Sequence, residues 1–165
     1  MMRAALGVLG LVLLLAAAAG AADWGQIKPG VSTQANVRAR YGAPTRETTQ
    51  KVESYDTLQW TYEGAQAPSG ITKMIVDFGL LTPSGYKKEV VRTFRLEPKA
   101  DVFNVKLVVD GWGPPTRVGK EGDAEFFLYE EGLLVYFGPD AKQVTVMIFT
   151  PPQKIPPASG SAPQR

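Results

Sequence analysis

The chain has 165 residues, with no cysteine or histidine and with 18 basic and 16 acidic residues that nearly balance. It therefore lacks the groups for a disulfide, a Ser-His-Asp triad, a Cys-His pair or the usual zinc sites. The charge balance also argues against nucleic acid as a partner. We expect a protein that is not an enzyme and that carries no cofactor.

The first 22 residues have the pattern of a secretory signal peptide. Arg3 precedes an apolar run over 4–19, and Gly20-Ala21-Ala22 offers a cleavage site. The run is shorter than the roughly 20 residues that a membrane-spanning helix needs. We expect residues 1–22 to be removed and the protein to be periplasmic or secreted. Peripheral association with the outer membrane is an alternative, although no cysteine is present to take a lipid anchor.

The first predicted element after the signal is a helix over Thr33–Tyr41. Ser32 is a good N-cap, and Gly42 and Pro44 stop the helix. The residues that follow change to a period of two, which is typical of half-buried strands. Strands are predicted at 58–63, at 74–79 and from Lys88 onward, with hairpin loops at 64–70 and 82–85.

The same order of elements recurs in the second part of the chain. Asp101 is expected to cap a helix with an apolar stripe from Val105 to Trp112, and Gly113 ends it. Strand segments follow at 125–130 and 133–138, and a third begins after Lys142. The hexapeptide Tyr41-Gly42-Ala43-Pro44-Thr45-Arg46 returns as Trp112-Gly113-Pro114-Pro115-Thr116-Arg117.

This repetition predicts the fold class and the domain organisation. We expect an α+β fold of two tandem helix-plus-three-strand repeats, at 23–97 and 98–150. Their helices would pack on one face of an antiparallel sheet to give a two-layer α/β sandwich. Residues 151–165 are rich in proline and lack apolar periodicity, so they are predicted to form a disordered tail.

The entry Ile27-Lys28-Pro29-Gly30-Val31-Ser32-Thr33, the stop Tyr41-Gly42-Ala43-Pro44-Thr45 and the strand Trp60-Thr61-Tyr62 resemble the SmpA/OmlA pattern of BamE-like outer-membrane assembly proteins. The tandem arrangement resembles the fold of the β-lactamase inhibitor protein. Members of the assembly family are lipoproteins with a single unit, unlike this chain.

The resemblance implies an exported, non-enzymatic protein-interaction module of the bacterial cell envelope, in assembly or maintenance of the outer membrane. One alternative is a protein inhibitor of a hydrolase. Another is a periplasmic protein that binds a small ligand or lipid, which would require a closed apolar cavity between the layers.

The outward faces of the two predicted sheets differ in polarity. The first is mostly polar, whereas the strands of the second repeat are apolar on both faces. In the first repeat the outward residues are Gln59, Thr61, Asp77, Thr93 and Arg95, with Ile75 and Val91 as apolar exceptions.

An exposed apolar sheet of that size is uncommon on a monomer, so something should cover it. We expect a protein partner of the cell envelope, or a second copy of the chain in a homodimer. The alternative covers are the segment around Trp24, the tail and the first repeat. The residues predicted to bind the partner are Phe126, Leu128, Leu134, Tyr136, Met147 and Phe149.

The acidic residues Glu121, Asp123 and Glu125 alternate, so they could line one side of an extended segment and hold a hard cation. Charged residues also keep the edge of a sheet from pairing with other chains. We favour the second interpretation and predict no metal site.

Overall fold

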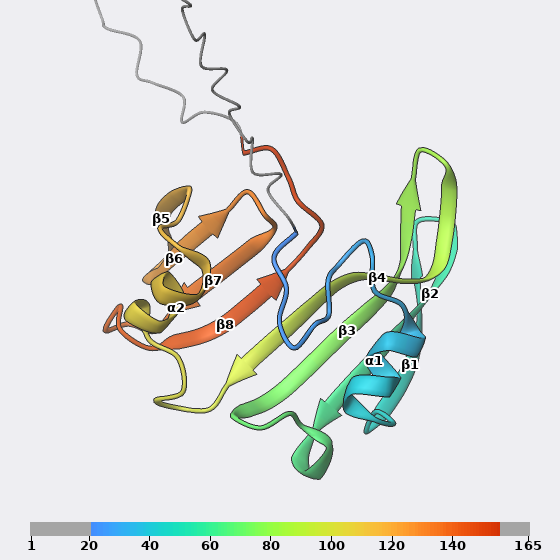
Figure 1. Cartoon of the computed structure of the whole chain (residues 1–165), viewed down its shortest axis with the longest axis horizontal. Coiled ribbons are helices and arrows are strands. Elements are labelled where there is room, and N and C mark those ends of the chain that lie inside the picture. The colour runs from blue at the N-terminus through green and yellow to red at the C-terminus, as the bar shows by residue number, and fades with distance from the viewer. Residues whose placement is uncertain (1–20, 156–165) are drawn as a thin grey trace, which may run out of the picture.

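The computed structural model describes residues 21–155, which form one eight-stranded antiparallel sheet with two α-helices on one face (Figure 1). The strand order is β1-β2-β3-β4-β8-β7-β6-β5, so the two halves of the sheet meet at a seam between β4 and β8. The helices are α1 (Gln34–Tyr41) and α2 (Val105–Trp112), and the strands are β1 (Arg46–Val52), β2 (Tyr55–Glu63), β3 (Ile71–Thr82), β4 (Gly85–Pro98), β5 (Arg117–Glu121), β6 (Ala124–Tyr129), β7 (Leu133–Phe137) and β8 (Val144–Phe149).

The predicted fold of two tandem helix-plus-three-strand repeats is wrong. A single sheet dominates the described chain, and each helix is followed by four strands. The strands that were missed, β1 and β5, lie at the two edges of the sheet. Most side chains of β1 are exposed, so its sequence shows no alternation of apolar and polar residues.

Both helices begin later than the sequence suggested. The N-cap residues are Thr33 and Asn104, not Ser32 and Asp101. The Oδ1 atom of Asn104 accepts a hydrogen bond from the amide of Leu107 at 3.0 Å, which satisfies a free donor of the first turn. The hydroxyl of Ser32 instead accepts a hydrogen bond from the amide of Lys28 at 2.9 Å.

The predicted stops of the helices are confirmed, because both helices end one residue before a glycine. Gly42 and Gly113 have φ angles of 77° and 80°, in the region that favours glycine. A buried tyrosine fixes each stop: the hydroxyl of Tyr62 donates to the carbonyl of Gly42 at 3.1 Å, and the hydroxyl of Tyr129 donates to that of Gly113 at 3.1 Å. The two halves therefore share one way of tying the end of a helix to the sheet.

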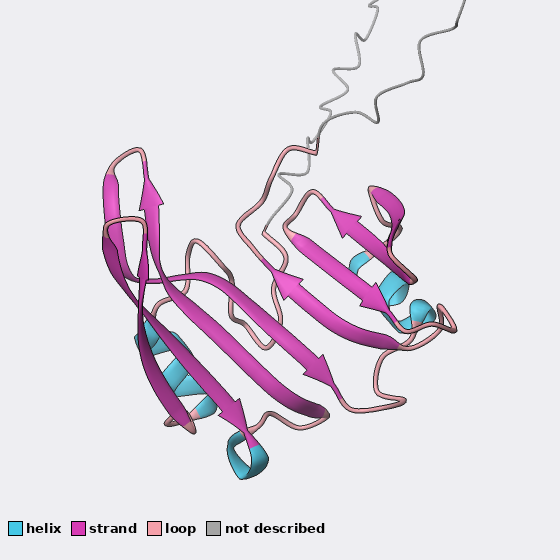
Figure 2. Ribbon diagram, turned by 180° about the vertical axis from the view of Figure 1, so that it is seen from behind, coloured by secondary structure: helices cyan, strands magenta, loops and turns pink. Residues whose placement is uncertain are grey.

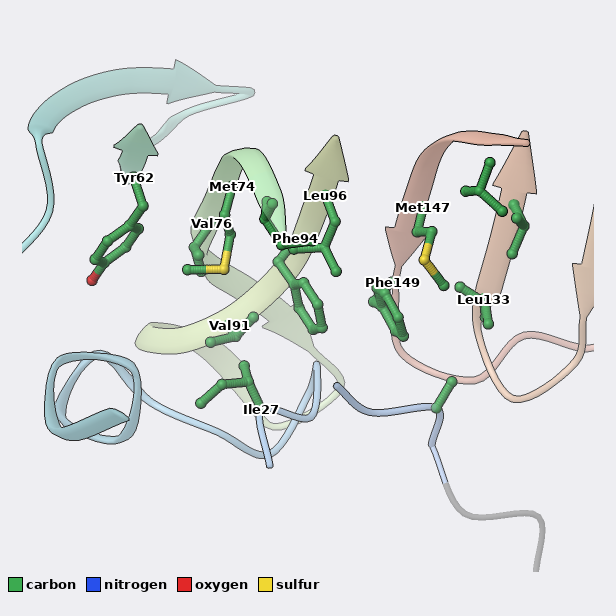
Figure 3. Close-up of a cluster of buried hydrophobic side chains, with 14 of the residues drawn as sticks. Ile27, Tyr62, Met74, Val76, Val91, Phe94, Leu96, Leu133, Met147 and Phe149 are labelled. Atoms are coloured by element: carbon green, nitrogen blue, oxygen red, sulfur yellow. The ribbon is translucent and has the colours of Figure 1, made fainter. Parts of the chain in front are cut away.

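The helix-facing side of the sheet carries the hydrophobic core, which runs across the seam (Figure 3). Phe94 of β4 stacks on Phe149 of β8 with ring centroids 4.3 Å apart and an angle of 9° between the rings. Leu96 and Met147, the next inward pair, are fully buried. The two halves of the sheet thus share one core.

The segment that precedes α1 covers the inner face between the two helices (Figure 1). The amide of Ala22 donates to the carbonyl of Glu131 at 2.7 Å, and the amide of Gly30 donates to that of Val91 at 2.8 Å. Ile27, between them, is 3% exposed and lies beside Val91 in Figure 3. The N-terminal segment therefore covers the core on the inner face of the sheet, and it does not cover the outer face.

The predicted signal peptide (1–22) falls almost entirely outside the described residues. No helix within 21–155 has the length and apolar character needed to cross a bilayer. The predicted tail begins too early, because the amide of Gln153 donates to the carbonyl of Glu130 at 3.0 Å. Residues 156–165 lie outside the described range.

Candidate functional site

Seen from behind, the second half of the sheet presents a face that neither helix covers (Figure 2). Neighbouring strands place apolar residues directly opposite one another there: Phe126 pairs with Tyr136, and Leu134 pairs with Ile148. Each of these side chains is only partly buried. We call this surface the outer apolar face, and its residues are Phe126, Leu128, Leu134, Tyr136, Val146 and Ile148.

Of the six residues predicted for partner binding, the structure brings four together on this face. They are Phe126, Leu128, Leu134 and Tyr136. The expected position of Met147 and Phe149 is wrong, because both side chains are fully buried in the core on the opposite face.

A bulge in β8 explains the error. Phe137 pairs with Val144, whereas the preceding Tyr136 pairs with Val146, so Thr145 is an extra residue in the strand. One extra residue moves every later side chain to the other face. Val146 and Ile148 are therefore outward residues that the sequence reasoning missed, and the apolar run of β8 gives no signal that could have revealed them.

The two aromatic side chains of the outer apolar face are fixed by local contacts. Phe126 lies over Gly119 of β5, where an added Cβ would approach the ring to 2.4 Å. The hydroxyl of Tyr136 donates to Oε2 of Glu121 at 2.6 Å, and this hydrogen bond raises the pKa of Tyr136. The centroids of the two rings are 6.0 Å apart. Contacts within the protein therefore set the positions of both rings on this face.

Two of the three acidic side chains of the 121–125 hairpin are paired with other side chains. Glu121 accepts the hydrogen bond of Tyr136, and Glu125 forms an ion pair with Lys120 at 3.5 Å. Within residues 21–155 no group of three histidine, cysteine or acidic side chains is placed to hold a metal ion. Glu121 instead belongs to the border of the outer apolar face.

Charges of both signs surround the outer apolar face. Arg95 of β4 lies opposite Ile148 and forms an ion pair with Glu97 at 3.2 Å. On the far side, Arg117 lies opposite Leu128 at one end of β5, and Glu121 lies at the other end of the same edge strand. The site thus has an apolar centre and a border of mixed charge.

The outer face of the first half is polar, as its sequence predicted. The carboxylate of Asp77 accepts hydrogen bonds from the side-chain amide of Gln59 at 2.8 Å and from the hydroxyl of Thr93 at 3.0 Å. Of the two apolar exceptions, Ile75 is half-buried, whereas Val91 is fully buried. The placement expected for Val91 is wrong because a bulge in the β3–β4 pairing turns it into the core.

Comparison with known proteins does not identify a family. No protein-family model matches the chain, and no curated protein matches it. The solved structure of a DUF4309 family protein (YjgB) from Bacillus subtilis subsp. subtilis str. 168 is 15% identical in sequence, with a TM-score of 0.46. The likeness covers 76% of this chain and 82% of that chain. At that score it assigns neither a family nor a function, and the resemblance to SmpA/OmlA proteins stays a prediction.

Proposed function

We propose that this protein is an exported, non-enzymatic module that binds a protein partner of the cell envelope through its outer apolar face. The observation that carries the proposal is the continuous apolar surface of β6, β7 and β8, which neither helix nor the N-terminal segment covers. Patches of this kind on an otherwise soluble domain mark interaction sites.

The composition of the outer apolar face favours a protein over other partners. Protein interfaces combine an apolar centre, enriched in aromatic residues, with a polar border. Phe126 and Tyr136 supply the aromatic groups, and the border contains both arginine and glutamate. A surface for nucleic acid would instead be basic throughout. We therefore expect a partner with an apolar patch of its own, bordered by charges of both signs.

The location in the cell envelope rests on the sequence. The signal-peptide pattern at 1–22 supports export. The resemblance to SmpA/OmlA proteins supports a role in assembly or maintenance of the outer membrane. Both are part of the proposal, and they predict that the partner is itself an envelope protein.

The test is site-directed photo-crosslinking in intact cells of the source organism. A photoreactive amino acid replaces Tyr136 in the full chain, and as a matched control it replaces Tyr55, a 37% exposed tyrosine of the first half. We expect an adduct with one envelope protein from position 136 and none from position 55. That protein is then purified, and its affinity for the wild-type chain is measured.

The variant Phe126→Ser/Tyr136→Ser should weaken this binding at least about thirtyfold, the loss typical of removing interface residues that dominate affinity. Circular dichroism of the variant checks that it remains folded. An adduct only with another copy of this chain would overturn the proposal in favour of a homodimer. Equal affinity of the folded variant and the wild type would also overturn it.

A further inference from the structure

A pocket lies at one end of the outer apolar face, where the sheet meets the segment after β8. Its volume is about 280 Å³. Leu128, Leu134 and Ile148 line it from the sheet, and Ile155 lines it from the C-terminal segment. At about 30 Å³ for each water in the liquid, this volume equals about nine water molecules, which suits one short aliphatic chain.

The wall that closes this pocket is held by the backbone. The amide of Thr150 donates to the carbonyl of Gly132 at 2.8 Å, and the amide of Gln153 donates to the carbonyl of Glu130 at 3.0 Å. Gly132 has a φ of 93°, and a Cβ at this position would lie 2.1 Å from the carbonyl oxygen of Thr150. The close approach requires glycine, so the backbone of the protein itself builds this wall of the pocket.

The charged residues that line the pocket are all cationic. Arg117 of β5 and Lys154 of the C-terminal segment contribute to the lining, and among the described residues no acidic side chain does. Lys154 is exposed. A cation at the mouth of an apolar pocket attracts a ligand with an apolar body and an anionic end.

We propose that this pocket binds an aliphatic carboxylate, with the chain against Leu128, Leu134 and Ile148 and the carboxylate at the mouth beside Lys154. This is a small-ligand site at one end of the outer apolar face, and it shares Leu128, Leu134 and Ile148 with the surface proposed for a protein partner. It differs from the closed cavity between the layers that the sequence left open as an alternative, because it lies on the outer side of the sheet.

The probe is octanoate, added to the isotope-labelled protein and followed by amide chemical shifts in NMR. We expect saturable shifts at Leu128, Leu134 and Ile148, and affinity that rises about fourfold per methylene from butanoate to octanoate. Octylammonium, which has the same chain and the opposite charge, should bind at least tenfold more weakly. Equal binding of the two amphiphiles, shifts centred on the helix side of the sheet, or no saturable shifts would each overturn the proposal.

Two variants in the C-terminal segment test the pocket without touching the core. Ile155→Ser removes apolar wall, and Lys154→Glu reverses the charge at the mouth; we expect each to weaken octanoate binding about fivefold. The matched controls are Leu81→Ser, at an exposed leucine of the first half, and Lys88→Glu, at an exposed lysine of β4. Equal effects of the variants and their controls would contradict the assignment. Because no partner protein is present, a failure here leaves the crosslinking result unaffected.

Discussion

The first half of the sheet carries a hydrogen-bonded cluster of Gln59, Asp77 and Thr93 on its outer face, whereas the second half carries Phe126, Leu134 and Ile148 there. The inner faces show no such difference, since both carry a buried tyrosine that ties a helix end to the sheet. The inner faces, which are alike in the two halves, maintain the fold. The outer face, which differs between them, holds the candidate site in the second half. Among residues 21–155, the apolar surface that spans three neighbouring strands lies on the second half.

The largest expected effect tests whether the two halves are one folding unit. Phe149→Ala removes a fully buried ring that stacks on Phe94 across the seam, so we expect the free energy of unfolding to fall by about 3–5 kcal/mol. Urea unfolding followed by circular dichroism should still show one transition. Val118→Ala, at a 58% exposed valine, should change the free energy by less than about 0.5 kcal/mol. Two separate transitions in Phe149→Ala would mean that the halves unfold independently.

A smaller effect tests whether the inner faces are equivalent. Tyr62→Phe and Tyr129→Phe each remove a hydroxyl that donates to a glycine carbonyl at 3.1 Å. We expect each to lower the free energy of unfolding by about 1 kcal/mol, the usual net value of one hydrogen bond. The comparison is between the two losses, measured in the same urea experiment. A loss confined to one variant would show that the repeated contact matters in only one half.

The smallest expected effect is a loss of stability in alkaline solution, and it is absent at neutral pH. Burial raises the pKa of Tyr62 and of Tyr129 to about 12. Because the folded pKa exceeds the ordinary value of 10.0, the unfolded chain releases these protons first. Their contribution to stability is complete below about pH 10 and is lost as the pH rises through about 12. Each Tyr→Phe variant should flatten this alkaline decline, and an unchanged decline in both would contradict the assignment.

The sequence predicted those parts of the fold that short-range chemistry determines. Glycine and proline marked the C-terminal ends of both helices, and alternation marked the strands that have one buried face, such as β2. The edge strands β1 and β5 were missed because polar residues on an exposed edge have no periodic signal. The fold therefore has a four-strand unit where three strands were expected.

The candidate site was predicted only in part, because alternation holds in β6 and β7 and fails in β8. Alternation placed Phe126, Leu128, Leu134 and Tyr136 on one face, since β6 and β7 pair without interruption over these residues. In β8 the alternation fails at Thr145, because a bulge depends on the pairing with β7 and leaves no mark in the apolar run over 146–149. The sequence also did not predict the wall of the pocket, because that wall is held by backbone hydrogen bonds between residues far apart in the chain, 150–153 and 130–132.

The hydrogen bond from Ala22 to Glu131 has a consequence for how the molecule is made. The part of the described chain that is synthesised first contacts the turn between β6 and β7, and the pairing of β4 with β8 at the seam forms only when β8 is available. Contacts between distant parts of a sequence slow folding. The native structure therefore cannot close until nearly all of residues 21–155 have been synthesised.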